Sequence, residues 1–503
     1  MDWISDCEEN HTLCSQASDS RPPSRLLDVD LRDGTPDIRL VVRVGHPIRY
    51  ATLSHVWGNT QPIKLTGELY EQFMERITFD SLPKTFMDAV IATRSLGLKY
   101  LWIDSLCIMQ DSPDDWEEQC QKMGEIYKNS FVTLAGPAAS GCDDGFLHRR
   151  QIPDSLTLNI SDGESQDDIV LSLSLSTHPY RLKLEPNSPL ATRAWVLQER
   201  LLSRRVLYFG SKGMYLECFT NVRFENCHYP TILDAQMDNI VPKPVMDDLL
   251  TRDKFFCYWA YLIAEYSSML LTKSMDRLPA LSGIASELQQ IHHIHYAAGL
   301  WHENLPQGLT WYISYRRLMR TTPHISKSEY LAPSWSWAAA RYPISWFIYN
   351  YEYKFISALE ILEVVTKAKG IDAFGMVIDG YIKVRGRRQN SLIRQYPHPN
   401  IKHRQVLYAD SGSSPSERLA VYDPDDLCHV RGTEFKVLLL FLGEFTSVRE
   451  SSRSVALAIE PIQDRIGVYR RIGFVSVDTY RGSSETGIGK IFDGIDDEVI
   501  TII

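Results

Sequence analysis

The sequence lacks any long apolar run and any closely spaced cysteine set. Its longest wholly aliphatic or aromatic run covers residues 437–442, far short of the roughly 20 residues that a helix needs to span a bilayer. The first 14 residues are acidic and lack the apolar centre of a secretory signal. The nine cysteines are scattered, which favours reduced thiols over a disulfide framework. We therefore expect a soluble, cytoplasmic protein without a membrane span.

Excess basic charge and internal repeats are also absent. The formal net charge is −10, so the sequence does not predict a nucleic-acid-binding protein that acts by neutralising phosphates. Hydrophobic residues make up 44% of the chain and charged residues 23%, which is ordinary for a globular protein. A length of 503 residues suggests about three domains.

The first half of the chain has the pattern of an α/β domain. Short apolar runs predict strands at residues 50–54, 100–103 and 131–135. Helical spacing of apolar residues predicts helices between them, at residues 82–97 and 111–127. Alternation of strands and helices is the signature of a parallel sheet covered by helices.

Changes in pattern along the chain predict four regions. We expect a loose tail at residues 1–22, an α/β domain at 23–228, a helical region at 229–344 and a β-rich C-terminal domain at 345–503. Residues 150–190 are polar and serine-rich, and they look like an insertion into the α/β domain. Further on in that domain, a helix is expected at residues 193–202, followed by strands at 206–209 and 214–217.

Three blocks in the first half resemble the fungal heterokaryon-incompatibility (HET) domain. They are LSHVWG at residues 53–58, LWIDSLCI at 101–108 and RAWVLQERLLS at 193–203. Between the second and third blocks, several residues also fall at the family's spacing: Asp115, Trp116, Gln119, Met123, Ile126 and Tyr127. Short sequence motifs further along the chain, such as APSWSW at residues 332–337, are typical of long fungal HET proteins. Two positions depart from the family pattern: Met109, where an acidic residue is usual, and Leu216, where a tryptophan is usual.

The resemblance implies a regulator of self/non-self recognition whose activation leads to cell death. HET domains are themselves distantly similar to TIR domains, which have a flavodoxin-like parallel sheet. Some TIR domains cleave NAD at its glycosidic bond with a helical glutamate. The segment Trp195-x-Leu197-x-Glu199 is similar to the catalytic helix of plant TIR domains. The resemblance thus implies Glu199 as the catalytic residue and NAD as a substrate, with no cofactor required.

Ligands of an open α/β sheet bind beyond the carboxyl ends of the strands, where the loops that follow two predicted strands should meet. A nucleotide-like molecule would be held there by these loops and by the helix that carries Glu199. We expect the following binding residues: Ser54, His55, Trp57, Gly58, Asp104 and Trp195. Trp57 offers a stacking face and Asp104 an acceptor for a ribose hydroxyl. Glu199 would stabilise positive charge that develops on the ribose.

Each of these residues also has a purely structural interpretation. Trp57 could pack in a core, Asp104 could cap a loop, and Glu199 could be a solvated partner on an amphipathic helix. Arg193 and Arg200 are expected to form salt bridges rather than to clamp a substrate. A Cys107–His55–Asp104 nucleophilic set is a further alternative. No metal site is expected, because Cys218, Cys227 and His228 lack compact zinc spacing.

Three functions remain open at this stage. The first is a HET-type effector that cleaves NAD, and the second is a stand-alone enzyme of fungal secondary metabolism built on the same scaffold. The third is a catalytically silent module that acts by self-assembly or by binding a protein partner. A cavity that joins Glu199 to the loops after residues 54 and 104 would favour the first.

Overall fold

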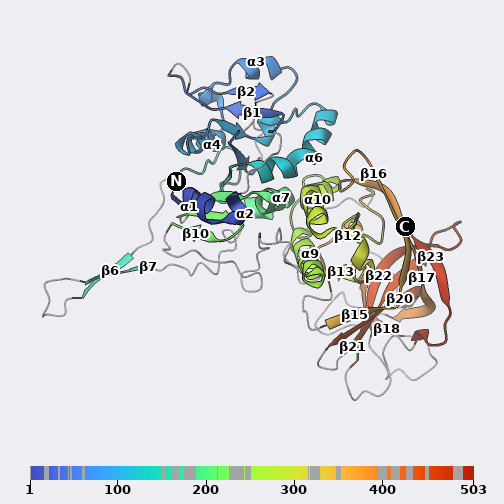
Figure 1. Ribbon diagram of the computed structural model, residues 1–503. Coiled ribbons are helices and arrows are strands. Elements are labelled where there is room, and N and C mark those ends of the chain that lie inside the picture. Colours follow the sequence, from blue (N-terminus) through green and yellow to red (C-terminus); the bar gives the residue numbers. More distant parts are fainter. Residues whose placement is uncertain are drawn as a thin grey trace. The chain divides into compact units, whose positions relative to one another are not determined.

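The computed structural model forms two compact units, Met1–Pro244 and Val245–Ile503, shown in Figure 1. It describes residues 2–15, 22–31, 34–42, 45, 48–58, 63–148, 155–160, 169–174, 188–211, 213–225, 243, 251–314, 317, 329–346, 353–394, 405–408, 420–425, 434–447, 452–479 and 491–503. No helix in these ranges combines the length and the apolar character that crossing a membrane requires.

Within the described residues, the first unit is built on an eight-stranded mixed sheet in the order β10-β9-β8-β5-β3-β4-β1-β2. The strands are β1 (Arg25–Asp28), β2 (Arg39–Val42), β3 (Tyr50–Ser54), β4 (Tyr100–Trp102), β5 (Val132–Ala135), β8 (Arg205–Gly210), β9 (Gly213–Cys218) and β10 (Val222–Phe224). The strands expected from the sequence are confirmed, but the sheet is mixed. Only β8, β5, β3 and β4 run parallel, and antiparallel strands extend both edges.

The order of the parallel strands determines where loops diverge. The chain leaves β3 for β4 on one side and then returns to the other side of β3 for β5 and β8. The loop after β3 therefore leads toward β4 and the loop after β5 leads toward β8, so the two loops diverge between β3 and β5. In open α/β sheets such a reversal of strand order is where ligands bind.

Three helices cover the parallel strands: α4 (Lys84–Ser95), α6 (Pro113–Asn129) and α7 (Ala194–Leu202), with the shorter α3 (Tyr70–Glu75) and α5 (Asp104–Cys107) nearby. The start of α6 follows from its sequence. Ser112 caps it by accepting a hydrogen bond from the Asp115 amide, and Pro113 occupies a first-turn position that needs no N–H. Acidic residues in that turn favour the positive end of the helix dipole.

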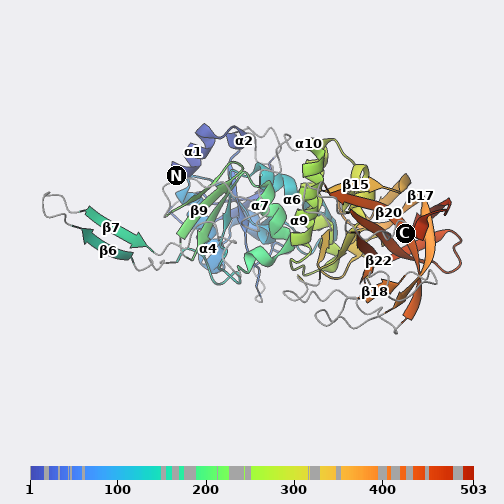
Figure 2. The ribbon, with the colours of Figure 1, turned by 90° about the horizontal axis from the view of Figure 1, so that it is seen from below.

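Helices α6 and α7 pack against each other on one face of the sheet, as Figure 2 shows. The register aligns Thr52 with Thr133, and their hydroxyls lie 2.7 Å apart. The Thr133 hydroxyl is 2.5 Å from that of Ser203, which directly follows α7. Tyr127 of α6 donates a hydrogen bond to the Leu53 carbonyl at 3.1 Å. Because successive strand residues face opposite sides, Thr52 and Ser54 both point toward α6 and α7.

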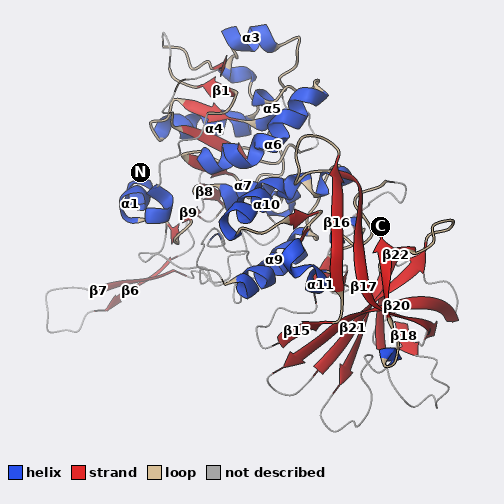
Figure 3. Ribbon diagram, turned by 45° about the vertical axis from the view of Figure 1, so that its right-hand side comes forward, coloured by secondary structure: helices blue, strands red, loops and turns tan. Residues whose placement is uncertain are grey.

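The opposite face of the sheet is covered by α4. Its Phe86 is fully buried and meets the ring of His55 edge-on, with the ring centres 5.1 Å apart. Figure 3 shows the helices in blue around the red strands of this unit. The core of the unit therefore has two layers of helix around one sheet, as expected for an α/β domain.

The N-terminal segment corrects one expectation. Residues predicted to be a loose tail contain two helices, α1 (Asp2–Asn10) and α2 (Thr12–Ser15). Ile4, Cys7 and Cys14 are buried. The polar composition concealed a narrow apolar stripe, in which Ile4 and Cys7 are one turn apart on the same helix face.

Residues 150–190, interpreted as an insertion, include a two-stranded antiparallel hairpin. Its strands are β6 (Ser155–Ile160) and β7 (Ile169–Ser174), visible in Figure 2.

The second unit contains both helices and a large sheet. Its helices are α9 (Arg252–Tyr266), α10 (Pro279–His292) and α11 (Leu305–Gly308), and short pairs form from β11 (Tyr296–Ala297) with β12 (Leu300–Trp301) and from β13 (Trp311–Ile313) with β14 (Ile344–Trp346). The β-rich character expected for its C-terminal part is confirmed by a nine-stranded sheet within the described residues. Its strands are β15 (Tyr353–Ser357), β16 (Glu360–Ala368), β17 (Val377–Arg394), β18 (Gln405–Tyr408), β19 (Ala420–Pro424), β20 (Glu434–Ser447), β21 (Ser452–Pro461), β22 (Val468–Thr479) and β23 (Asp497–Ile502).

One buried arginine joins the β13–β14 pair to the nine-stranded sheet of the second unit. The Arg471 guanidinium on β22 lies 3.4 Å from the centre of the Trp311 ring on β13. It also donates to the Leu309 carbonyl at 2.6 Å and to Asp425 at 2.8 Å. The small sheet and the large sheet are thus packed as one body.

Candidate functional site

The loops that follow β3 and β4 meet through Asp104. The Trp57 indole N–H donates a hydrogen bond to Asp104 Oδ2 at 2.9 Å. His55 Nδ1 lies 3.9 Å from Asp104 Oδ1, which also accepts from the Ser105 amide at 2.7 Å. This convergence follows from the sheet, because β3 and β4 are parallel neighbours and their carboxyl ends share one edge. Trp57 and Asp104 are therefore partners of each other.

Gly58 brings the loop after β5 to the same place. Its φ is +75°, a conformation that residues with a Cβ rarely adopt. A Cβ at Gly58 would lie 2.7 Å from the Cα of Gly141. Cys142 Sγ also lies 3.6 Å from the Val56 carbonyl oxygen. The loops after β3 and β5 thus touch backbone to backbone at the reversal of strand order.

Glu199 faces the interior of this unit, where its carboxyl group lies near Ser54. The residue is 8% exposed. Burial raises the pKa of Glu199 to about 7, and the nearby charge of Asp104 acts in the same direction. The hydroxyls of Ser54 and Tyr127 and the guanidinium of Arg193 oppose that rise in pKa. A carboxyl group with a pKa near neutrality can exist in both protonation states under physiological conditions.

The interpretation of Glu199 as a solvated helix residue is wrong. Helix α7 is buried on nearly all sides, and Gln198, Glu199 and Arg200 are all inaccessible. Arg200 forms the salt bridge expected for it, through two bonds to Glu217 of 2.5 and 2.9 Å. Burial by itself would raise the pKa of Glu217, but Arg200 holds it below its usual range. Among the residues that the structure describes, no cation is bonded to Glu199 in this way.

The charge of Arg193 acts on several of the residues around Glu199. It precedes α7 and is half-buried. Its charge lowers the pKa of Glu199, His55 and Tyr127. With the residues that the structure describes, it forms no ion pair within 4 Å, so the salt bridge expected for Arg193 is not among them.

His55 is buried between the two loops and α4. Burial lowers the pKa of His55, while Asp104 opposes that effect. Its side chain is 3% exposed, and its Nε2 has no hydrogen-bond partner among the described residues. The ring is therefore neutral at neutral pH, with Nδ1 directed toward Asp104.

A small cavity lies beside the cluster. Its volume is about 10 Å³, and its lining includes Ser54, Thr133, Val196 and Tyr208. That volume is about what one water molecule needs, and Ser54 and Thr133 offer it polar partners. In this conformation the cavity cannot hold a nucleotide.

The other candidate residues lie at the edge of the cluster or outside it. Trp195, four positions before Glu199 on α7, is half-buried and packs against the core of the first unit. Burial raises the pKa of Cys107 to about 12, so its thiol stays protonated and a Cys107–His55–Asp104 nucleophilic set is not supported. Met109 donates its backbone amide to Asp115 at 2.8 Å, and Leu216 is buried in the core. Neither departure from the family pattern changes the cluster.

Three members of the cluster are not among the binding or catalytic residues expected from the sequence. Tyr127 falls at the family's spacing, which is a usable signal. Arg193 is expected only to form a salt bridge, and no motif points to Cys142. No metal ligands were expected, yet the described residues bring Cys7, His11, Cys14 and Cys218 together. That grouping is separate from the Glu199 cluster.

The part of the chain that holds the cluster matches a known protein family. Residues 50–199 match the model of the family described as heterokaryon incompatibility protein (HET). The match begins at the first residue of β3 and ends at Glu199. It therefore includes every residue of the cluster described above: Ser54, His55, Trp57, Gly58, Asp104, Tyr127, Cys142, Arg193 and Glu199. No curated protein and no solved structure matches the chain.

Proposed function

This chain carries a HET domain, which supports a heterokaryon-incompatibility type of role, and we propose that the domain executes that role by cleaving NAD. In this proposal Glu199 is the catalytic residue, and the protein acts in self/non-self recognition and regulated cell death. The observation that carries the proposal is the meeting of a buried carboxyl group of raised pKa with the loops after β3 and β4.

The strand order supports a flavodoxin-like and TIR-like scaffold. Numbered along the chain, the four parallel strands lie in the order 2-1-3-4, which is the beginning of the flavodoxin-like order. In that order ligands bind where the first and third strands separate. Here that position lies between β3 and β5, next to Ser54 and Gly58.

The chemistry requires a carboxylate beside the ribose. As the bond between the ribose C1′ and the nicotinamide nitrogen breaks, nicotinamide leaves with the electron pair and positive charge develops on the ribose. The ionised form of Glu199 stabilises that charge. Water then adds to C1′ and loses a proton, which yields ADP-ribose, nicotinamide and one proton. Burial raises the pKa of Glu199 only to about 7, so its ionised form is available at neutral pH.

Binding roles follow from the positions of the remaining residues. Asp104 would accept a hydrogen bond from a ribose hydroxyl. Trp57 would no longer bond to Asp104 and would stack on a ring of the substrate. Arg193 would pair with a phosphate. Because the cavity holds only about one water, entry of a nucleotide requires the loops after β3 and β5 to separate. Self-assembly or a protein partner would supply that change.

The proposal is tested by incubating the full-length protein with NAD and measuring free nicotinamide. We expect release by the wild type and a loss of at least about 100-fold in Glu199→Gln, which keeps the shape and removes the charge. Glu118→Gln is the matched control, since Glu118 is exposed and pairs with Lys122 one turn further along α6. Absence of nicotinamide from assembled wild-type protein, or an unchanged rate in Glu199→Gln, would refute the proposal.

A catalytically silent interaction module is the second candidate. The observation in its favour is the closed site, in which Gly58 contacts Gly141 and the adjoining cavity is water-sized. Expression of Glu199→Gln in a cell that the wild type kills separates the two functions. Full toxicity of the variant favours the silent module, and survival of the cells favours the enzyme.

A further inference from the structure

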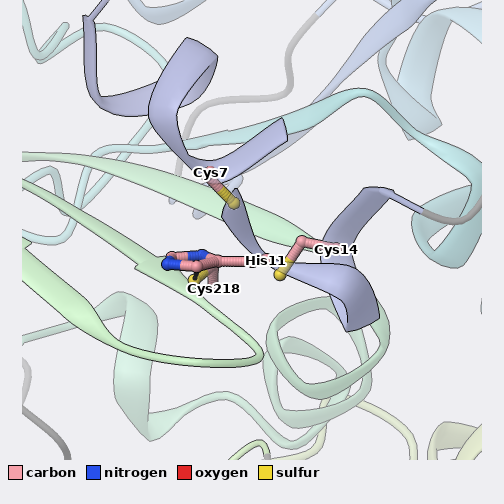
Figure 4. Close-up of side chains that lie close together, drawn as sticks. All are labelled: Cys7, His11, Cys14 and Cys218. Atoms are coloured by element: carbon pink, nitrogen blue, oxygen red, sulfur yellow. Dashed lines mark hydrogen bonds between the residues drawn. The ribbon is translucent and has the colours of Figure 1, made fainter. Parts of the chain in front are cut away.

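Three cysteines and one histidine come together at the N-terminal end of the first unit. Cys7 lies on α1, His11 directly follows it, Cys14 lies on α2, and Cys218 ends β9 (Figure 4). One potential ligand atom of each lies within 4.8 Å of all the others. Cys218 Sγ is 3.4 Å from His11 Nδ1, across 207 positions of sequence. All three cysteines are buried and free of disulfides.

The helical turns of the N-terminal segment bring three of the four potential ligands close together. Cys7 and His11 are four residues apart, and the His11 amide bonds to the Cys7 carbonyl at 3.3 Å, as in a continued helical turn. The Cys14 amide then bonds to the His11 carbonyl at 2.9 Å, which turns the chain back. The spacing Cys-x3-His-x2-Cys thus converges on one point. The fourth ligand comes from β9 and could not be paired with them by spacing.

We propose that Cys7, His11, Cys14 and Cys218 bind a structural zinc ion. Three thiolates and one imidazole are a common zinc ligand set, with Zn–S distances of about 2.3 Å in a tetrahedron. Such a tetrahedron places its sulfur atoms about 3.8 Å apart, so ligand atoms within 4.8 Å of one another need move little. With four protein ligands the ion has no open position, and its role is to hold structure.

Hydrogen bonds around the sulfur atoms suit thiolates. The backbone amides of Thr220 and Asn221 both donate to Cys218 Sγ at 3.4 Å, and Arg205 Nε donates to Cys7 Sγ at 3.3 Å. His11 Nε2 lies 3.2 Å from the Asn221 side-chain amide. The Asn221 atom nearest to Nε2 is the amide nitrogen Nδ2. A histidine that binds metal through Nδ1 carries a proton on Nε2, and Asn221 would accept a hydrogen bond from it once its side-chain amide is turned by 180° to present the carbonyl oxygen.

The surrounding charges match an anionic site. Zinc bound to three thiolates and a neutral imidazole carries one net negative charge. Arg205 is buried beside Cys7, and Lys243, also buried, donates to the Ser203 carbonyl at 2.6 Å. Both cations influence the cysteines electrostatically: Arg205 acts on Cys7, and Lys243 interacts with Cys14 and Cys218. The charge of Lys243 is influenced more by the buried Glu217 than by either thiol, so Arg205 is the cation whose charge the zinc–thiolate group would balance.

The consequence of the site is mechanical. The ion would fasten α1 and α2 to the end of β9, and β9 is the antiparallel neighbour of β8, the strand that follows the Glu199 helix. The ion would therefore strengthen the packing of α1 and α2 on the folded unit, which already buries Ile4. Binding releases the thiol protons, so the affinity falls as the pH is lowered.

The experiment is a metal analysis of the full-length protein purified under reducing conditions from zinc-supplemented medium. We expect about one zinc ion per chain, and replacement by Co²⁺ should give the visible absorption of tetrahedral thiolate coordination. Cys218→Ser should lower the zinc content at least tenfold, whereas Cys257→Ser, in the second unit, should keep it.

Because Cys218 is buried and its variant could misfold, His11→Ala provides a second test at a half-buried position. This variant should also lose zinc while its far-ultraviolet circular dichroism stays that of the wild type. Wild-type protein with far less than stoichiometric zinc and no Co²⁺ absorption would overturn the proposal. So would mass spectrometry that finds a disulfide between any two of Cys7, Cys14 and Cys218 in that preparation, or zinc content that both variants retain.

Discussion

At the scale of single residues, the central feature is a carboxyl group held where charge is costly. Glu199 is buried with no cation bonded to it among the described residues, while Glu217 on β9 is buried and bonded to Arg200. The two carboxyl groups thus have opposite pKa shifts, raised for Glu199 and lowered for Glu217. Divergent pKa values in adjacent acids separate a group that can react from one that supports the fold.

The raised pKa of Glu199 predicts a pH-dependent stability difference. The folded pKa of about 7 lies above the model value of 4.5, so the folded state binds more protons and stability is lost as pH rises between these values. At pH 8 we expect Glu199→Gln to be more stable than the wild type, by at most about 3 kcal/mol. At pH 5 most of this gain should disappear. Urea unfolding at both pH values measures it, and an equal difference at each would contradict the prediction.

Glu217 should behave in the opposite way. Glu217→Gln leaves the buried Arg200 guanidinium without its counter-charge, so we expect a loss of about 3–5 kcal/mol in the free energy of unfolding at pH 7. The exposed pair of Glu118 and Lys122 offers the comparison, because Glu118→Gln should change stability by less than about 0.5 kcal/mol. Similar losses in the two variants would show that the Arg200 pair is not buried as described.

At the scale of elements, the contact between two loops defines the site. Gly58→Ala should destabilise the first unit by at least about 2 kcal/mol, because the residue combines a positive φ with a Cβ position 2.7 Å from Gly141. Gly97 has a similar φ of +71° but open space around it, so Gly97→Ala should cost only about 1 kcal/mol. Thermal unfolding of both variants distinguishes them, and equal losses would mean that the loops do not touch.

The elements themselves were largely predictable, and their pairing was not. Apolar runs gave β3, β4 and β5, and helical spacing gave α4 and α6, because each is buried on a regular face. The two strands that extend the sheet beyond β4, β1 and the edge strand β2, are only four residues long and carry little pattern of their own. Whether a strand joins parallel or antiparallel depends on connections that no local pattern encodes. This is why the mixed character of the sheet was missed.

The candidate site was also predictable only in part. The positions of Ser54 and Asp104 followed from the rule that parallel strands end at one edge. The inward direction of Glu199 did not, because α7 reads as amphipathic while the fold buries it on nearly every side. The four-residue cysteine and histidine group was equally hidden, since Cys218 joins the others only through the fold.

At the scale of the whole molecule, the chain consists of two units that can be considered separately. We expect a fragment of residues 1–244 to fold alone, because the complete eight-stranded sheet and its helices lie within it. Its chemical unfolding should be cooperative, and its circular dichroism should be that of an α/β domain. A fragment that is unfolded, while the full chain unfolds in one transition, would show that residues 245–503 are needed for its stability.

The proposed site is tested most directly by measuring the ionisation of the Glu199 carboxyl group. Infrared difference spectra between the wild type and Glu199→Gln, with carboxyl groups labelled with ¹³C-glutamate, isolate the stretching band of this one group across a pH titration. We predict that its protonated band decreases with a midpoint near pH 7, as burial beside Asp104 requires. A midpoint near the ordinary glutamate value of 4.5 would mean that the carboxyl group is solvated, and the proposed site would not exist.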